Sequence, residues 1–481
     1  MTEKVEKDNI GEVERPGPAE EAPSEVTLSD RSSVEHPYRS FLEGASFARC
    51  HTTAFTSCGT ETYARSLLMA GNGFPIWDPV GDTGRPSAHL KSGLMIGDVG
   101  YLSDEGDFQY HFNIFLPPSS EVHFNAPANL EPLFPALQSK EIKTETNYFA
   151  PGTVIASTGV EVTRVQESPL ALNAIIKGRE CGILVLPNGA YREDVISTTR
   201  IRDYAQKHAL DWYRFLNGTR GHVICPNGSL CLVTGYDKAT SWATCTSNPQ
   251  GLAESGSVIT VTYENGEFLR NPDAYRKCSQ SGDGSETCAV FVRAIRLAVS
   301  LRDWTKKILS YQPPTRILYY NMLSGPVVGL RARIHTLRLK QFLPKRKSVN
   351  ATLCIFHPLD VLLHVLLRES QIADVATLDD SVWCHLTDKS NTDPLVQTWN
   401  LWIKVLETHE IHNADGLVTL VPAENDHSQA KPSFSPSSLL FNLPSRIQRE
   451  YNRIRRRREI VRKISAVFPG PPLPKDVLIV S

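Results

Sequence analysis

The alternation of apolar and polar positions predicts strands in the first two thirds of the chain. Phe108, Tyr110 and Phe112 alternate with polar residues after a turn cluster at 103–106. A period of two is typical of a half-buried strand, so this segment and the apolar stretch 93–101 are predicted to form a hairpin.

A second block of the chain carries the same signals. The run 183–186 predicts a buried strand. Asn-Gly turns predict two more hairpins, one joining 223–224 to 230–233 and one turning at 265–266. The apolar segment 289–300 fits either a strand or a short helix.

Helical spacing predicts one long amphipathic helix over 194–216 and further helices toward the carboxyl end. Pro358 suits a first helical position, and Asp393 suits a helix start. A last helix is predicted over about 446–467. Its expected apolar stripe is Ile447, Tyr451, Ile454, Val461 and Ile464.

This pattern predicts an α+β protein with a β-rich antiparallel body, one long amphipathic helix, a smaller α-helical carboxyl-terminal unit and a disordered amino terminus. A length of 481 residues fits two to four structural units. The expected segments are a disordered acidic tail at 1–36, a β-rich α+β body at 65–330, a basic linker at 331–348, a helical unit at 349–422, a Pro/Ser-rich linker at 423–445, and a basic amphipathic helix with a Pro-rich end at 446–481.

The formal net charge of −1 conceals a strong segregation of charge along the chain. Residues 1–36 hold ten acids against four basic residues, whereas 331–347 hold seven basic residues and no acid. Residues 446–463 hold nine basic residues against two acids. Such a pattern suits either contact between basic segments and the acidic body or binding of an external polyanion.

The sequence also indicates a compartment. It begins without the apolar stretch of a secretory signal, and it has no uncharged apolar run of about 18 residues that would suit a membrane span. Its ten cysteines are scattered, with no CxxC pair, which fits a reducing environment. We therefore expect a cytoplasmic protein, with the nucleus as the alternative location.

Several short motifs stand out along the chain: Gly73-Phe74-Pro75-Ile76-Trp77, Gly97-Asp98-Val99-Gly100, Phe112-Asn113-Ile114, Leu186-Pro187-Asn188-Gly189, Trp212-Tyr213 and Gly235-Tyr236-Asp237-Lys238. With weaker matches at 357–358 and 383–384, they resemble a family of uncharacterised proteins of mushroom-forming (basidiomycete) fungi. The resemblance implies kinship and a fungal cytosol. The family has no known activity, so it implies no chemistry and no site residues.

The familiar catalytic and ligand motifs are incomplete. Gly235–Lys238 lacks the second glycine and the adjacent Ser/Thr of a nucleotide loop, and no Gly-x-Ser-x-Gly occurs. His409, His412 and Asp415 would place two imidazoles on one helix face and capture a metal weakly; the alternative is a polar helix end. We expect no metal site and no cofactor.

The distinctive feature is the basic helix. Its candidate polyanion-binding residues are Arg446, Arg449, Arg453, Arg455, Arg456, Arg457, Arg458, Arg462 and Lys463. Three interpretations compete: nucleic-acid contact or nuclear import, attachment to an anionic membrane surface, and docking on the acidic body with the arginines merely solvated.

The leading hypothesis is a non-enzymatic binding or scaffold protein whose basic helix contacts a polyanion; protein partners remain unknown. The alternative is an enzyme with a site assembled from dispersed residues of the β-rich body. Asp98, His111 and Asp237 would be its first suspects, because they are polar positions within apolar strand segments. The sequence assigns no residue a catalytic role.

Overall fold

The computed structural model describes twelve stretches of the chain, all within the unit Pro37–Ser481: 59–80, 83–103, 105–165, 171–177, 180–219, 225–247, 258–279, 287–308, 357–370, 372–387, 394–423 and 443–467. The predicted acidic tail at 1–36 and basic linker at 331–348 lie outside them, as do most of the linker at 423–445 and the Pro-rich end.

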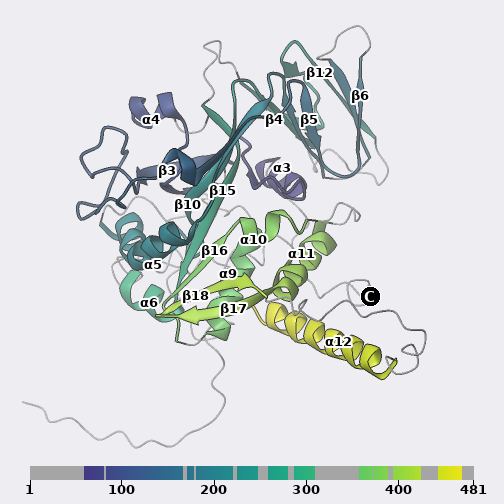
Figure 1. Ribbon diagram of the computed structural model, residues 1–481. Coiled ribbons are helices and arrows are strands. Elements are labelled where there is room, and N and C mark those ends of the chain that lie inside the picture. The colour runs from purple at the N-terminus through teal and green to yellow at the C-terminus, as the bar shows by residue number, and fades with distance from the viewer. Residues whose placement is uncertain are drawn as a thin grey trace, which may run out of the picture. The chain divides into compact units, whose positions relative to one another are not determined.

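A large sheet forms the centre of the described structure (Figure 1). Its strands are β1 (Phe74–Pro75), β2 (Asp98–Leu102), β3 (Phe108–Asn113), β4 (Ile142–Phe149), β9 (Ala190–Val195), β10 (Leu230–Ala239), β15 (Cys288–Val299), β16 (Val375–Asp379), β17 (His409–Ala414) and β18 (Leu417–Pro422). The main path runs β17-β18-β16-β15-β10-β2-β3, while β1, β9 and β4 attach beside it. All pairs are antiparallel except β16 with β18.

Two smaller sheets face each other across a core of their own. One has the order β14-β11-β8-β5 and the other β13-β12-β7-β6. Their strands are β5 (Thr153–Ala156), β6 (Val160–Arg164), β7 (Leu172–Ile176), β8 (Gly182–Leu186), β11 (Ala243–Ser247), β12 (Ile259–Glu264), β13 (Glu267–Phe268) and β14 (Ala274–Cys278). In β8, Ile183 and Val185 enter the core between these sheets, whereas Leu184 and Leu186 enter a second core with Phe291 of β15.

Helices cover both faces of the large sheet. They are α3 (Gly59–Leu68), α4 (Ser87–Ser92), α5 (Thr199–Arg214), α6 (Leu301–Asp303), α9 (Pro358–Glu369), α10 (Ser381–Cys384), α11 (Pro394–Thr408) and α12 (Leu443–Ser465). On β15, Ile295 and Leu297 pack in the core that includes α5, whereas Ala294 and Ala298 pack in the core that includes α9, α11 and α12. Figure 1 shows α5 and α9 on opposite sides of β15.

The fold is mixed α+β and rich in antiparallel strands, as the sequence predicts. The first hairpin is confirmed, with Asp98 opposite Asn113 in the β2–β3 pair. The turn at 265–266 is also confirmed, since Asn265 and Gly266 both have positive φ, 52° and 91°, as a type I′ hairpin requires.

The segment 289–300 forms a strand, β15, because it pairs with β10 on one side and with β16 on the other, and it is buried along its whole length. The long helix begins at Thr199 and not at 194, because residues up to Val195 belong to β9, which pairs with β4 and β10. Its last residues continue into a π-helical turn, Phe215–Thr219.

The part of the chain predicted as a helical unit at 349–422 contains strands as well as helices. Pro358 opens α9, as predicted. The histidines at 409 and 412, which a helix would have aligned on one face, lie in β17. Moreover, β16 pairs with β15 of the body, so one sheet runs through both parts of the chain.

Candidate functional site

Helix α12 is docked on the protein through the carboxyl-terminal half of its apolar side. Ile460, Ile464 and Val467 are 5%, 0% and 3% exposed and belong to the core that α9 and α11 share (Figure 1). The predicted stripe is only partly the one used: Ile464 is buried and Val461 half-buried, but Ile454 is 45% exposed. The side chains of Ile447 and Tyr451 lie outside the described residues.

An ion pair holds the same end of the helix. Lys463 Nζ lies 3.1 Å from Glu369 Oε2, at the end of α9, and 3.3 Å from Glu459 Oε1 one turn earlier in α12. The ammonium group is therefore paired with two carboxylates of the protein itself. Lys463, one of the predicted polyanion-binding residues, thus takes part in holding α12 against α9.

Unlike Lys463, most of the described arginines of α12 are exposed. Arg455, Arg456, Arg458 and Arg462 are exposed, and no carboxylate of the described residues pairs with them. Arg457 is half-buried. The side chains of Arg446, Arg449 and Arg453 lie outside the described residues.

The helix geometry places three of the exposed arginines on one face. Arg455, Arg458 and Arg462 follow one another at intervals of three and four residues, so they form a row. Arg458 and Arg462 each precede a buried isoleucine, Ile460 or Ile464, by two residues, a rotation of about 200° around the axis. This row, which we call the arginine row, therefore points away from the core.

Asp98, the first of the three candidate catalytic residues, is buried, and its carboxylate makes three polar contacts. Its carboxylate accepts hydrogen bonds from the backbone N–H of Met95 at 2.7 Å and from Asn113 Nδ2 at 2.8 Å, and it contacts His89 Nε2 at 2.9 Å. His89 in turn stacks on the Tyr110 ring at 3.6 Å. This cluster ties α4 to β2 and β3.

Asp237 is likewise buried, in a network of two arginines. Arg192 donates two hydrogen bonds to its carboxylate, both at 2.7 Å, and Arg293 Nη1 donates a third at 2.9 Å. Arg293 also bonds Asp194, and these acids outweigh the effect of burial, which by itself lowers the pKa of Arg293, so that its pKa is raised. The network joins β9, β10 and β15.

His111 differs from the other two suspects because neither ring nitrogen has a hydrogen-bond partner among the described residues. The ring lies near those of Tyr101 and Phe124, with centroids 5.8 and 6.4 Å away. Burial lowers the pKa of His111 to about 4. At neutral pH it is an uncharged aromatic packing residue.

A second buried network joins α9 to the sheet, and sequence reasoning missed it. The backbone N–H of Leu359 donates to His357 Nδ1, so Nε2 carries the proton and donates to Asp380 at 3.1 Å. Trp383 Nε1 donates to the same carboxylate at 2.7 Å, and Arg296 Nη2 lies 2.8 Å from Asp360. The signal available in the sequence was the pair of arginines, 293 and 296, inside an otherwise apolar twelve-residue strand.

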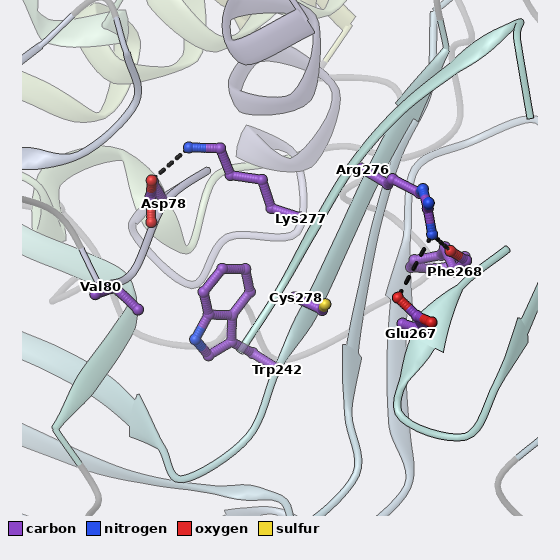
Figure 2. A pocket seen from close by; sticks show the side chains of 8 residues that line it. All are labelled: Asp78, Val80, Trp242, Glu267, Phe268, Arg276, Lys277 and Cys278. Atoms are coloured by element: carbon purple, nitrogen blue, oxygen red, sulfur yellow. Dashed lines mark hydrogen bonds and ion pairs between the residues drawn. The ribbon is translucent and has the colours of Figure 1, made fainter. Parts of the chain in front are cut away.

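A pocket of about 380 Å³ lies beside the edge strand β14 (Figure 2). It is lined by Asp78, Val80, Trp242, Glu267, Phe268, Arg276, Lys277 and Cys278. Figure 2 shows Lys277 directed toward Asp78, with which it forms an ion pair, and Arg276 directed toward Phe268 and Glu267.

The chemistry of this pocket is limited. Its two cations are already paired with its two carboxylates, and burial raises the pKa of the Cys278 thiol, which disfavours the nucleophilic thiolate. Among the eight lining residues there is no histidine to act as a base, and none of Asp98, His111 and Asp237 is among them. The three suspects are not brought together in this pocket.

Metal sites and membrane-spanning helices each require a particular arrangement of residues in the described part of the chain. There, no three His, Cys, Asp or Glu side chains come together as a metal site would require. Within the same ranges, no helix is both long enough and apolar enough to cross a membrane.

Comparison with other proteins adds no candidate activity. No protein-family model matches the chain, and the search of curated proteins finds no relative.

Proposed function

We propose that this protein is a non-enzymatic binding or scaffold protein that contacts a polyanion through α12, and that it works in the cytoplasm or the nucleus. The single observation that carries the proposal is the arginine row, three exposed guanidinium groups that pair with no acid of the described residues, on a helix that the core holds in place. Arginine forks suit phosphate, sulfate and carboxylate groups.

Docking of the helix supports the proposal energetically. A flexible basic segment must lose conformational entropy when it binds, whereas α12 is already ordered by its buried isoleucines and by the Lys463–Glu369 ion pair. The row therefore offers its charges in a preorganised arrangement. Arg456 is a further exposed arginine of the helix but lies outside the row, since it precedes Ile460 by four residues.

The test is retention on a heparin column over a salt gradient. We expect the triple variant Arg455→Gln, Arg458→Gln, Arg462→Gln to elute at clearly lower salt than the unaltered protein. Glutamine keeps a good helix propensity, so α12 remains helical. Substitution is preferred to removal of 446–481, because a truncation would also take Ile460, Ile464 and Val467 out of the core.

The matched control removes three basic charges elsewhere. Lys143, Lys177 and Arg302 have side chains that are 66%, 54% and 66% exposed, and each pairs with an acid. Their replacement by glutamine should change elution less than loss of the arginine row does. Equal shifts for the two triple variants would mean that retention follows net charge alone, and the proposal would fail.

A further inference from the structure

We infer that the polyanion is the phosphate backbone of a nucleic-acid duplex, contacted without regard to base sequence. This inference rests on the proposed function and narrows it to one class of partner. It is carried by the division of α12 into a buried apolar face and an exposed arginine row.

The buried face argues against a membrane partner. A helix that lies on a bilayer must insert its apolar side among the lipids, and this insertion supplies much of the binding energy. Ile460 and Ile464 of α12, and Val467 just after it, are instead packed in the core with α9 and α11. Among the described side chains of the helix, the one large apolar group that is exposed is Ile454. The described surface of α12 therefore has positive charges for lipid headgroups but few apolar side chains that could insert among the lipids.

The spacing of the row suits a duplex backbone. At about 1.5 Å per residue, Arg455 and Arg462 lie about 10 Å apart along the helix axis. This length is roughly three base-pair steps of 3.4 Å, so the row can reach two or three successive phosphates of one strand. Contacts of this kind position a protein on a duplex and carry no sequence information.

A single strand is a poorer fit for the same surface. Proteins that bind single strands without sequence preference stack the bases on exposed aromatic rings beside the basic groove. In the described structure the exposed aromatic side chains are Phe124, Phe134 and Tyr275, and none of them belongs to α12. The described face of the helix thus offers guanidinium groups to phosphates and no platform to bases.

The experiment measures binding of the full chain to labelled probes by fluorescence anisotropy across a series of salt concentrations. The probes are two short DNA duplexes of unrelated sequence, the corresponding single strands, and vesicles of phosphatidylcholine with about one third phosphatidylserine. We expect binding to both duplexes with equal affinity within about twofold, and weaker binding to single strands and vesicles.

The variants identify the binding residues. Replacing the arginine row by glutamine should lower the slope of log affinity against log salt for a duplex by up to about 2.7, because each neutralised phosphate adds about 0.9 to that slope. The control variant at Lys143, Lys177 and Arg302 should keep the slope of the unaltered protein. Ile454→Ala should leave duplex binding unchanged, since the inference gives that side chain no contact with the backbone.

The outcomes separate this inference from the proposed function. Binding to vesicles that exceeds binding to duplexes, and that falls in Ile454→Ala, would overturn the duplex inference while leaving polyanion binding intact. Stronger binding to single strands than to duplexes would also overturn the duplex inference and leave polyanion binding intact. Failure to bind any of these probes or heparin would overturn both, and so would duplex binding that is insensitive to loss of the arginine row.

Discussion

At the scale of single residues, the polar positions that attract attention in the sequence serve to hold the sheet together. Asp237 is fully buried and receives three hydrogen bonds from Arg192 and Arg293. Removal of one partner from such a buried ion pair typically costs about 3–5 kcal/mol, because it leaves a buried charge uncompensated. Gly235 is part of the same arrangement, because a Cβ there would lie 2.0 Å from Asp194 Oδ1.

His111 provides a prediction about pH at the same scale. The pKa of His111 in the folded protein, about 4, lies below the ordinary value of 6.5. Between these two pH values the imidazole is protonated in the unfolded chain and neutral in the folded protein. Neutral His111 therefore leaves the free energy of unfolding undiminished above pH 6.5, and this free energy falls progressively as the pH is lowered toward 4. At pH 5 the loss amounts to about 2 kcal/mol in the free energy of unfolding.

The variant His111→Phe should remove this dependence, because phenylalanine packs beside Tyr101 and Phe124 without a titrating group. Urea denaturation at pH 7 and pH 5 measures the difference between the two proteins. We expect the variant to lose less stability on acidification. His385, which is exposed, provides the control: His385→Gln should follow the unaltered protein at both pH values. Parallel losses in His111→Phe and the unaltered protein would contradict the prediction.

At the scale of elements, α12 combines a buried apolar side with an exposed row of arginines. Its two isoleucines at 460 and 464 are part of the main core, whereas its arginine row faces outward. The same amphipathic pattern would equally suit a free helix or a membrane-bound one. What distinguishes these cases is whether α9 and α11 offer a surface for the apolar side, and in this protein they do.

A pair of substitutions in the same helix tests that docking. Ile464→Ala removes a fully buried side chain and should lower the free energy of unfolding by about 2–5 kcal/mol. Ile454→Ala, at a position that is 45% exposed, should change it by no more than about 0.5 kcal/mol. Thermal and urea denaturation provide the comparison. If both variants matched the unaltered protein, α12 would not be part of the core.

At the scale of the whole molecule, residues far apart in the chain share one sheet and one core. The core beneath α9 includes Ala64 near the start of the described residues and Val467 at their end. Strand β15 pairs with β10 on one side and β16 on the other, and Arg296 of β15 lies 2.8 Å from Asp360 of α9. These interactions cross the predicted boundary between the body and the helical unit.

This arrangement predicts that α9 and β15 open together. In native-state hydrogen exchange of the full chain, the slowest amides of the two elements should show the same free energy of opening and the same dependence on urea. A common value is expected because opening of either element would expose the buried surface that they share. Earlier exposure of α9, with β15 still protected, would instead support an independent carboxyl-terminal unit.

The local elements were largely determined by the sequence itself. Period-two alternation and an Asn-Gly turn are properties of neighbouring residues, so the β2–β3 hairpin and the turn at Asn265 could be predicted before any tertiary contact was known. Pro358 at the start of α9 and the existence of α12 belong to the same class. The charge of the arginine row is also explicit in the sequence.

Long-range pairing was decided by the tertiary structure alone. Residues 289–300 are apolar throughout most of their length, and such a run becomes a strand or a helix according to its neighbours; here β10 and β16 supply the partners. The same holds for Asp98, Asp237 and Lys463, whose polarity is visible in the sequence but whose partners lie elsewhere in the chain. Because burial and ion pairing depend on residues brought together only by folding, the sequence could propose a basic helix, and only the tertiary structure decided which of its described side chains are buried, paired or exposed.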